Sequence, residues 1–241
     1  MSDEKAINDF FETILGGESR TYNDHNWYVA GNKLKGYIEG VQSTPYPLLK
    51  KPLSEYTLAE VKAFQSRGRD NNGQLWATGR YQIIPTTLAS MQQKLNIPDT
   101  SKYDKETQDK IGLGLLMNRP NVRKYIKGEV ADTTQTLQLA ALDIAKEWSS
   151  VGVPYPLKGS RKNVDKNQSY YSGGGDKAST DTEIVQEKLK ALRMNFLDRA
   201  QETIKDVSDF AKKNWIPVSI VILGVVGLIY YAVKSKKISA V

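Results

Sequence analysis

Apolar side chains recur at helical spacing along most of this chain, and this periodicity limits the fold more than any other feature. The clearest stripe, over residues 133–148, is formed by Leu137, Ala140, Ala141, Ile144, Ala145 and Trp148. Similar stripes predict helices over residues 2–15, 57–64, 85–95 and 104–118. Residues 20–52, rich in Asn, Gly, Tyr and Pro, predict loops with slight β structure. The sequence therefore predicts a mainly α domain of the α+β kind.

The C-terminal part predicts a long helix and a membrane span. Residues 183–213 are highly charged but keep an apolar seam near heptad spacing, which indicates either a self-associating stalk or a solvated helix docked on its own domain. Residues 216–233 contain no charged residue and are bordered by aromatic and Lys side chains, which is typical of a transmembrane helix. The predicted order is a domain over 1–182, an amphipathic stalk over 183–214, a transmembrane helix over 215–234 and a basic tail over 235–241.

The N-terminus has neither a basic region nor an apolar region of the kind found in signal peptides. We therefore expect a single-pass membrane protein that is held by its C-terminal segment.

Composition narrows the chemistry. The 241 residues include no Cys and one His, His25, so thiolate chemistry is excluded and a zinc site or a Ser-His nucleophile is disfavoured. We expect no metal and no cofactor. The net charge of +7 suits an acidic polymer or an anionic surface, but no clustered basic stripe predicts nucleic-acid binding. Carboxylates, hydroxyls and amides remain as the reactive groups.

Two short segments carry the candidate functional residues. Glu18 follows Gly16-Gly17 at the end of an apolar helix, a position that can place a carboxyl in a partly desolvated cleft and raise its pKa towards that of a general acid. Tyr81 and Gln82, in the turn that starts at Gly79, offer a ring face and an amide that can hold an N-acetylated sugar. The alternative is structural, with Tyr81 in the core and Gln82 capping a turn.

These segments, in this order, resemble the lysozyme-like lytic transglycosylases, and most closely the lambda-type phage endolysins. The resemblance rests on Glu18-Ser19 followed by Gly79-Arg80-Tyr81-Gln82-Ile83. It continues through Lys94-Leu95, Asp99, Gln108-Asp109, Glu147-Trp148-Ser149-Ser150-Val151, Asn167-Gln168-Ser169-Tyr170-Tyr171 and Asp176-Lys177-Ala178. It covers roughly residues 5–180. The C-terminal segments and the Pro-rich stretch over 46–66 have no counterpart in that family.

The resemblance implies a lysozyme-like fold and cleavage of the β-1,4 bond between N-acetylmuramic acid and N-acetylglucosamine in peptidoglycan. Glu18 would protonate the leaving oxygen and then accept the proton of the muramoyl C6 hydroxyl, which gives a 1,6-anhydro product. Tyr81 and Gln82 would contact the substrate, and Ser19 would support Glu18 by hydrogen bonding. These assignments make the chain a bacteriolytic lyase.

A hydrolytic muramidase is the runner-up activity. Hydrolytic phage lysozymes carry an Asp and a Thr at positions that are Trp27 and Lys33 here, which argues against hydrolysis, although Asp24 and Glu39 remain candidates for a second carboxylate.

The expected setting is the virion of a membrane-containing phage, where the enzyme would open the cell wall. The alternatives are a membrane-anchored cellular or prophage muramidase and a non-catalytic lysozyme-like binding or assembly protein. The expected partners are peptidoglycan strands, a lipid membrane through 215–234, and a second copy of the chain or other virion membrane proteins.

Overall fold

The computed structural model describes residues 3–16, 19, 21–29, 32–35, 49–68, 73–172 and 178–213. The chain divides into two compact units, residues 1–193 and residues 194–241. In the described ranges, the helices are α1 (Asp3–Leu15), α2 (Leu58–Gln65), α3 (Pro85–Lys94), α4 (Lys105–Asn118), α5 (Pro120–Ile126), α6 (Thr134–Ala145) and α7 (Thr182–Lys213), with a 3-10 turn over Leu53–Glu55. The strands are β1 (His25–Val29), β2 (Asn32–Lys35), β3 (Gln74–Thr78), β4 (Leu157–Lys158) and β5 (Asn163–Val164).

Local sequence signals explain where several helices begin and end. Thr57 caps α2 and forms a capping box with Glu60, whose carboxylate accepts the Thr57 backbone N–H at 2.7 Å. Pro85 occupies the first turn of α3, where a missing N–H costs little. Pro120 follows the end of α4 and occupies the first turn of α5. α1, α2, α3, α4 and α6 thus lie where the apolar stripes predicted helices.

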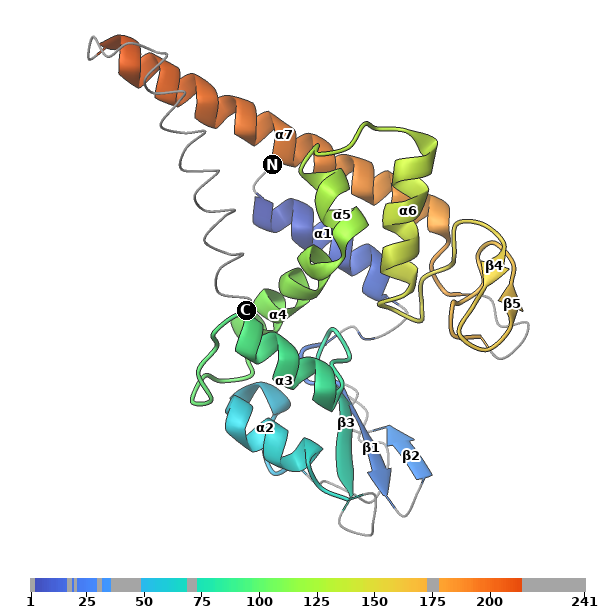
Figure 1. The fold of residues 1–241 in the computed structure, drawn as a ribbon. Coiled ribbons are helices and arrows are strands. Elements are labelled where there is room, and N and C mark those ends of the chain that lie inside the picture. The colour runs from blue at the N-terminus through green and yellow to red at the C-terminus, as the bar shows by residue number, and fades with distance from the viewer. Residues whose placement is uncertain are drawn as a thin grey trace, which may run out of the picture. The chain divides into compact units, whose positions relative to one another are not determined.

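The predicted fold class was wrong in two respects, and the first concerns β structure. The first unit mixes helices with two small sheets, one with the strand order β2-β1-β3 and the other formed by β4 and β5, all antiparallel (Figure 1). The slight β structure expected over residues 20–52 is present as β1 and β2, but the limits of β1 were not predicted because five residues inside an Asn- and Tyr-rich stretch give too short a pattern. What fixes β1 is tertiary: Trp27, which is buried, pairs with Leu75 on β3.

The second correction concerns the membrane. In the described part of the chain, no helix has both the length and the apolar character needed to cross a bilayer. The segment on which the prediction fell, residues 215–234, and the basic tail lie outside the described residues. The predictions of a single-pass membrane protein and of lipid contact through 215–234 are corrected accordingly. The hypothesis of a membrane-containing virion depended on that span.

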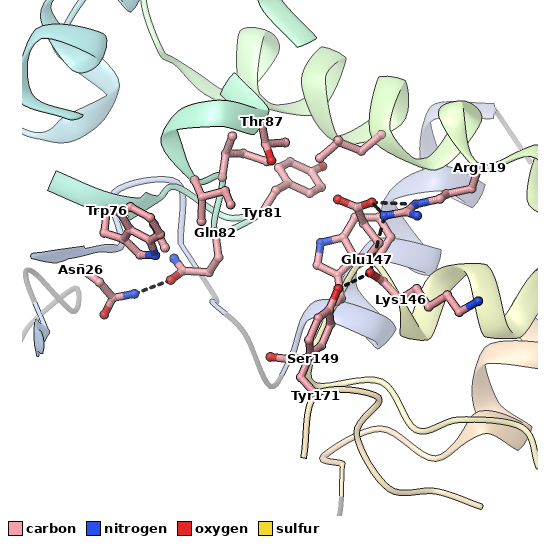
Figure 2. Close-up of a pocket in the computed structure, with 15 residues that line it drawn as sticks. Asn26, Trp76, Tyr81, Gln82, Thr87, Arg119, Lys146, Glu147, Ser149 and Tyr171 are labelled. Carbon is pink, nitrogen blue, oxygen red and sulfur yellow. Dashed lines mark hydrogen bonds and ion pairs between the residues drawn. The ribbon is translucent and has the colours of Figure 1, made fainter. Parts of the chain in front are cut away.

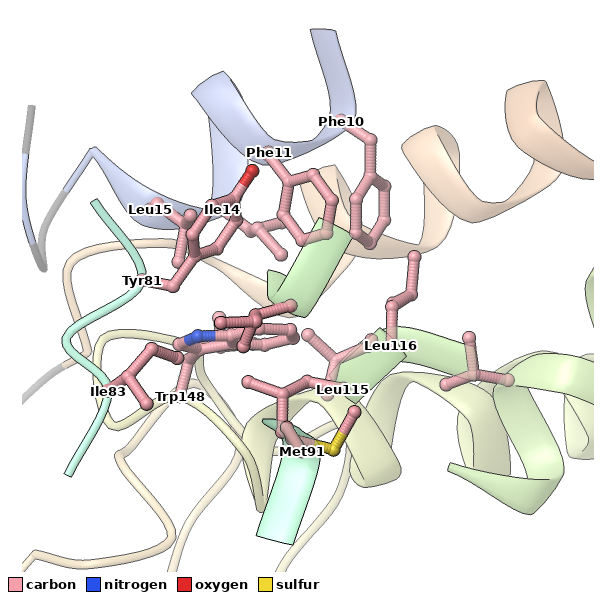
Figure 3. Packing of buried hydrophobic residues seen from close by; sticks show 14 of the residues in the cluster. Phe10, Phe11, Ile14, Leu15, Tyr81, Ile83, Met91, Leu115, Leu116 and Trp148 are labelled. Atoms are coloured by element: carbon pink, nitrogen blue, oxygen red, sulfur yellow. The ribbon is translucent and has the colours of Figure 1, made fainter. Parts of the chain in front are cut away.

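The core joins α1 to the turn after β3 and to the segment after α6. Phe11 on α1 packs edge-on against Tyr81, with ring centroids 4.9 Å apart, and against Trp148 at 5.9 Å (Figure 3). All three side chains are buried. The elements that surround the candidate site therefore share one hydrophobic cluster, which fixes their positions within the first unit.

α7 contributes to this core only through its first turns. Val185, Leu189 and Leu192 are buried in the cluster of the first unit, beyond the predicted domain boundary at residue 182. In the second unit, Phe196 and Phe210 on the same helix are exposed. The first part of the predicted seam thus packs against its own domain, and self-association of the remainder stays a prediction.

Two glycines of α4 allow a matched test of this packing. A Cβ at Gly112 would lie 2.4 Å from the ring of Tyr81, which is held by its hydroxyl bond to Asp109, whereas a Cβ at Gly114 would lie 2.6 Å from the flexible end of Met91. We expect Gly112→Ala to lower the free energy of unfolding by about 1–3 kcal/mol. Gly114→Ala should cost less, about 1 kcal/mol or under, because its Cβ meets only the flexible side-chain ends of Met91 and Leu95 and because Ala favours the helix. Urea unfolding compares the two, and equal effects would contradict the tight packing at Tyr81.

Candidate functional site

The first unit contains a pocket of about 380 Å³ between two chemically different walls (Figure 2). One wall carries Asn26 from β1, Trp76 from β3 and Gln82 from the following turn. The facing wall carries Arg119 and Glu147, from the helix ends at α4 and α6, together with Ser149 and Tyr171. The volume lies in the range of small-molecule sites, and the lining residues are mainly polar, which suits a glycan.

Gln82 lies in this pocket because of the turn that precedes it. Gly79 has φ +70° and Gln82 has φ +48°, and the flanking residues Thr78 and Ile83 pair across the turn, with N–O distances of 3.1 and 2.9 Å. The Gln82 amide donates to the Gly79 carbonyl at 2.9 Å and accepts from Asn26 at 2.6 Å (Figure 2). The side chain is therefore oriented by the protein while it lines the pocket.

Tyr81 combines the two roles that the sequence left open. It lines the pocket, but only 2% of it is exposed, and its hydroxyl donates to Asp109 at 2.8 Å on α4. Burial, together with the Asp109 contact, raises the pKa of Tyr81 above its ordinary value. The phenol therefore stays neutral, and its main contribution is to hold the turn against the core.

Arg80 is the centre of a polar network that sequence reasoning did not identify. Its guanidinium, 6% exposed, donates to Glu12 on α1 and to the hydroxyl of Tyr22, each at 2.7 Å. The Tyr22 hydroxyl in turn donates to Asp109 at 2.8 Å, and burial with this hydrogen bond raises the pKa of Tyr22. The network ties α1, the segment after it, the turn and α4 together. The only sequence signal for this network was the Arg80-Tyr81 pair inside the Gly79–Ile83 segment.

Glu18, the candidate acid, lies outside the described residues. The described residues on either side of it are bonded to segments that carry pocket residues. Before it, the Ile14 carbonyl accepts from Ser150 Oγ at 3.2 Å. After it, the Asp24 carbonyl accepts from the Gly79 N–H at 2.6 Å. Ile14 and Asp24, ten positions apart, thus contact the segments that carry the pocket residues Ser149 and Gln82, respectively.

Ser19, predicted to support Glu18, is buried, and its hydroxyl makes a local turn. Its Oγ donates to the Thr21 carbonyl at 3.0 Å and accepts the Thr21 N–H at 3.2 Å. The backbone N–H of Ser19 donates to Leu15 at 3.1 Å, next to the end of α1. Ser19 thus shapes the exit from the helix.

The alternative second carboxylates are not in the pocket as far as the structure describes them. Asp24 is described and does not line it, and Glu39 lies outside the described residues. Trp27 is buried in the core. Among the described residues that line the pocket, the only carboxylate is that of Glu147.

Glu147 and Arg119 form an ion pair that the sequence analysis missed. Arg119 Nε donates to Glu147 Oε2 at 2.7 Å, and Nη2 contacts the same oxygen. Nearby, the Tyr171 hydroxyl donates to the Lys146 carbonyl at 2.5 Å, and burial together with the charge of Glu147 raises the Tyr171 pKa. The available sequence signal was Glu147, a charged residue directly before the pocket residue Trp148. Its partner Arg119, 28 positions away, had no signal of its own in the sequence.

His25, the first residue of β1, gives a pH-dependent prediction. It is buried, its Nδ1 lies 2.8 Å from the Asn23 carbonyl, and burial lowers its pKa. The unfolded chain, with an ordinary pKa of about 6.5, then binds the proton more readily than the folded chain, so the contribution of His25 to stability falls as the pH drops below about 6.5. We expect the loss of unfolding free energy between pH 7 and 5 to be smaller in His25→Gln. Parallel curves for the two proteins would contradict a buried neutral imidazole.

The site thus combines an amide and aromatic wall with an ion-paired wall. Comparisons with protein families, with characterised proteins and with solved structures find no significant match to this chain.

Proposed function

We propose that this chain cleaves the glycan strands of peptidoglycan as a lytic transglycosylase, with Glu18 as the acid and base. The observation that carries the proposal is the placement of Gln82 in the pocket, on a turn bonded to the segment that follows Glu18. The resemblance of Glu18-Ser19 and the Gly79–Gln82 turn to the lysozyme-like transglycosylases supplies the reaction class.

The chemistry needs one carboxyl group. Glu18 donates its proton to the glycosidic oxygen as the bond from that oxygen to the muramoyl C1 breaks. The resulting carboxylate accepts the proton of the C6 hydroxyl while C6 oxygen bonds to C1, which returns Glu18 to its starting state without water. The oriented amide of Gln82 suits an acetamido group, and Trp76 offers a ring for a sugar face.

The ion pair on the facing wall favours transglycosylation over hydrolysis. A retaining hydrolase needs a second carboxylate as nucleophile, and an inverting one needs it to activate water. Glu147, the one carboxylate among the described residues that line the pocket, is bonded to Arg119 through Oε2, so it is already engaged in an ion pair and is not a free second carboxylate.

Release of dye from labelled peptidoglycan by the full chain tests the proposal. Wild type should release dye, and Gln82→Ala should lower the rate about tenfold because an oriented hydrogen-bonding side chain is lost. Gln93→Ala, an exposed glutamine on α3, is the control and should match wild type. No release by folded wild type, or no difference between the two variants, would contradict the proposed site.

A further inference from the structure

The ion pair of Arg119 and Glu147 lies on the pocket wall that faces Gln82 (Figure 2). Arg119 occupies the junction between α4 and α5, where its N–H donates to Leu116 at 3.2 Å. Glu147 follows the end of α6, where its N–H donates to Ile144 at 2.9 Å. Helix ends therefore fix both backbones, and the side chains are only 31% and 15% exposed.

The pair leaves one acceptor and one donor unused on its two side chains. Arg119 directs Nε and Nη2 to the same oxygen, Oε2 of Glu147. In the described part of the chain, neither Glu147 Oε1 nor Arg119 Nη1 has a hydrogen-bond partner. Partly buried ion pairs need further hydrogen bonds to offset the loss of water around them. Sugar hydroxyl groups can fill both, because a hydroxyl can donate to a carboxylate oxygen or accept from a guanidinium N–H.

The charge of the pair selects the kind of ligand. The two charges cancel, so the pair attracts neither an anion nor a cation. An anionic group would be repelled by the Glu147 carboxylate, and a cationic group would be repelled by the Arg119 guanidinium. We propose that Arg119 and Glu147 form a subsite for an uncharged N-acetylhexosamine unit of the glycan, and that they discriminate against a unit that bears a carboxylate. The proposal rests on the proposed function for the class of polymer, and it assigns to this wall the glucosamine-type unit rather than the muramic acid.

Binding of two soluble probes to the full chain tests this subsite. The first is the uncharged tetramer of N-acetylglucosamine, and the second is a tetramer in which N-acetylmuramic acid alternates with N-acetylglucosamine. We expect Glu147→Gln to raise the Kd for the uncharged tetramer at least tenfold, because hydrogen bonds to charged groups are strong. The Kd for the anionic tetramer should rise less or fall, because Arg119 then carries an uncancelled charge. Calorimetry gives both constants.

Two further variants separate recognition from folding. Arg119→Lys keeps the charge but loses the planar fork, and it should also weaken binding of the uncharged tetramer. Asp9→Asn breaks an exposed ion pair with Lys5, outside the pocket, and should leave both constants unchanged. A variant that is merely less stable would raise the Kd for both probes alike, and that result would overturn the subsite. Unchanged Kd values in Glu147→Gln and Arg119→Lys would overturn it as well.

The same samples, assayed for dye release, separate the two proposals. If wild type cleaves peptidoglycan but tetramer binding does not depend on the ion pair, the subsite alone is overturned. Binding that depends on the ion pair, without any cleavage by wild type, would overturn the transglycosylase and leave the subsite as a glycan-binding site.

Discussion

Replacing Glu18 with Gln is expected to lower the rate of peptidoglycan cleavage by roughly 10²- to 10⁴-fold, the range that general acid–base catalysis contributes. The amide keeps the size of the side chain but has no proton to give to the glycosidic oxygen. Because one group serves both proton transfers in the proposed reaction, no other residue replaces it. Dye release under substrate excess measures the effect.

Glu129→Gln is the matched control, since Glu129 is an exposed carboxylate in the turn after α5 and does not line the pocket. It should retain the wild-type rate, and both variants should unfold at the wild-type temperature. If Glu18→Gln kept more than about a tenth of the activity, the acid would have to be another residue, because the loss would fall short of the range for acid–base catalysis.

Gly79→Ala is expected to cause the largest loss of stability, about 3 kcal/mol or more. A side chain at φ +70° costs about 1–2 kcal/mol by itself. In addition, the new Cβ would lie 2.0 Å from Oε1 of Gln108, a fully buried side chain. Gln108 accepts from the Arg80 N–H at 3.0 Å and donates to the Tyr103 carbonyl at 2.7 Å, so moving it leaves buried polar groups without partners, at about 1–3 kcal/mol each.

Gly128→Ala isolates the backbone cost, because Gly128 has the same φ of +70°. It should lose only about 1–2 kcal/mol. Urea unfolding of both variants gives the difference between their losses of unfolding free energy, and this difference measures the effect of displacing Gln108. Equal losses would show that Gln108 adjusts freely and does not hold the turn.

The local part of the fold could be predicted from the sequence, and the tertiary part could not. The Thr57 and Glu60 capping box and the stripe of α6 depend on residues a few positions apart, so a short stretch contains the whole signal. β1 needs β3 as a partner, almost fifty residues later, and α5 is seven residues long. The predicted span over 215–234 rested on an uncharged apolar run bordered by aromatic and Lys side chains, and it lies outside the described residues.

The candidate site divides in the same way. Gln82 was found because a Gly-led turn and an amide stand together in the sequence, and the structure places this side chain in the pocket. The network around Arg80 was missed because its partners, among them Glu12 and Asp109, come from separate helices. Arg119 and Glu147 look like ordinary surface charges until the ends of α4 and α6 bring them together.

The mass of the released muropeptides tests the central claim most directly. If Glu18 alone transfers the proton and the C6 hydroxyl closes the ring, the full chain should release fragments that end in 1,6-anhydro-N-acetylmuramic acid. Fragments one water heavier, with free reducing ends, would mean that a second group activates water and that the single-carboxyl chemistry is wrong.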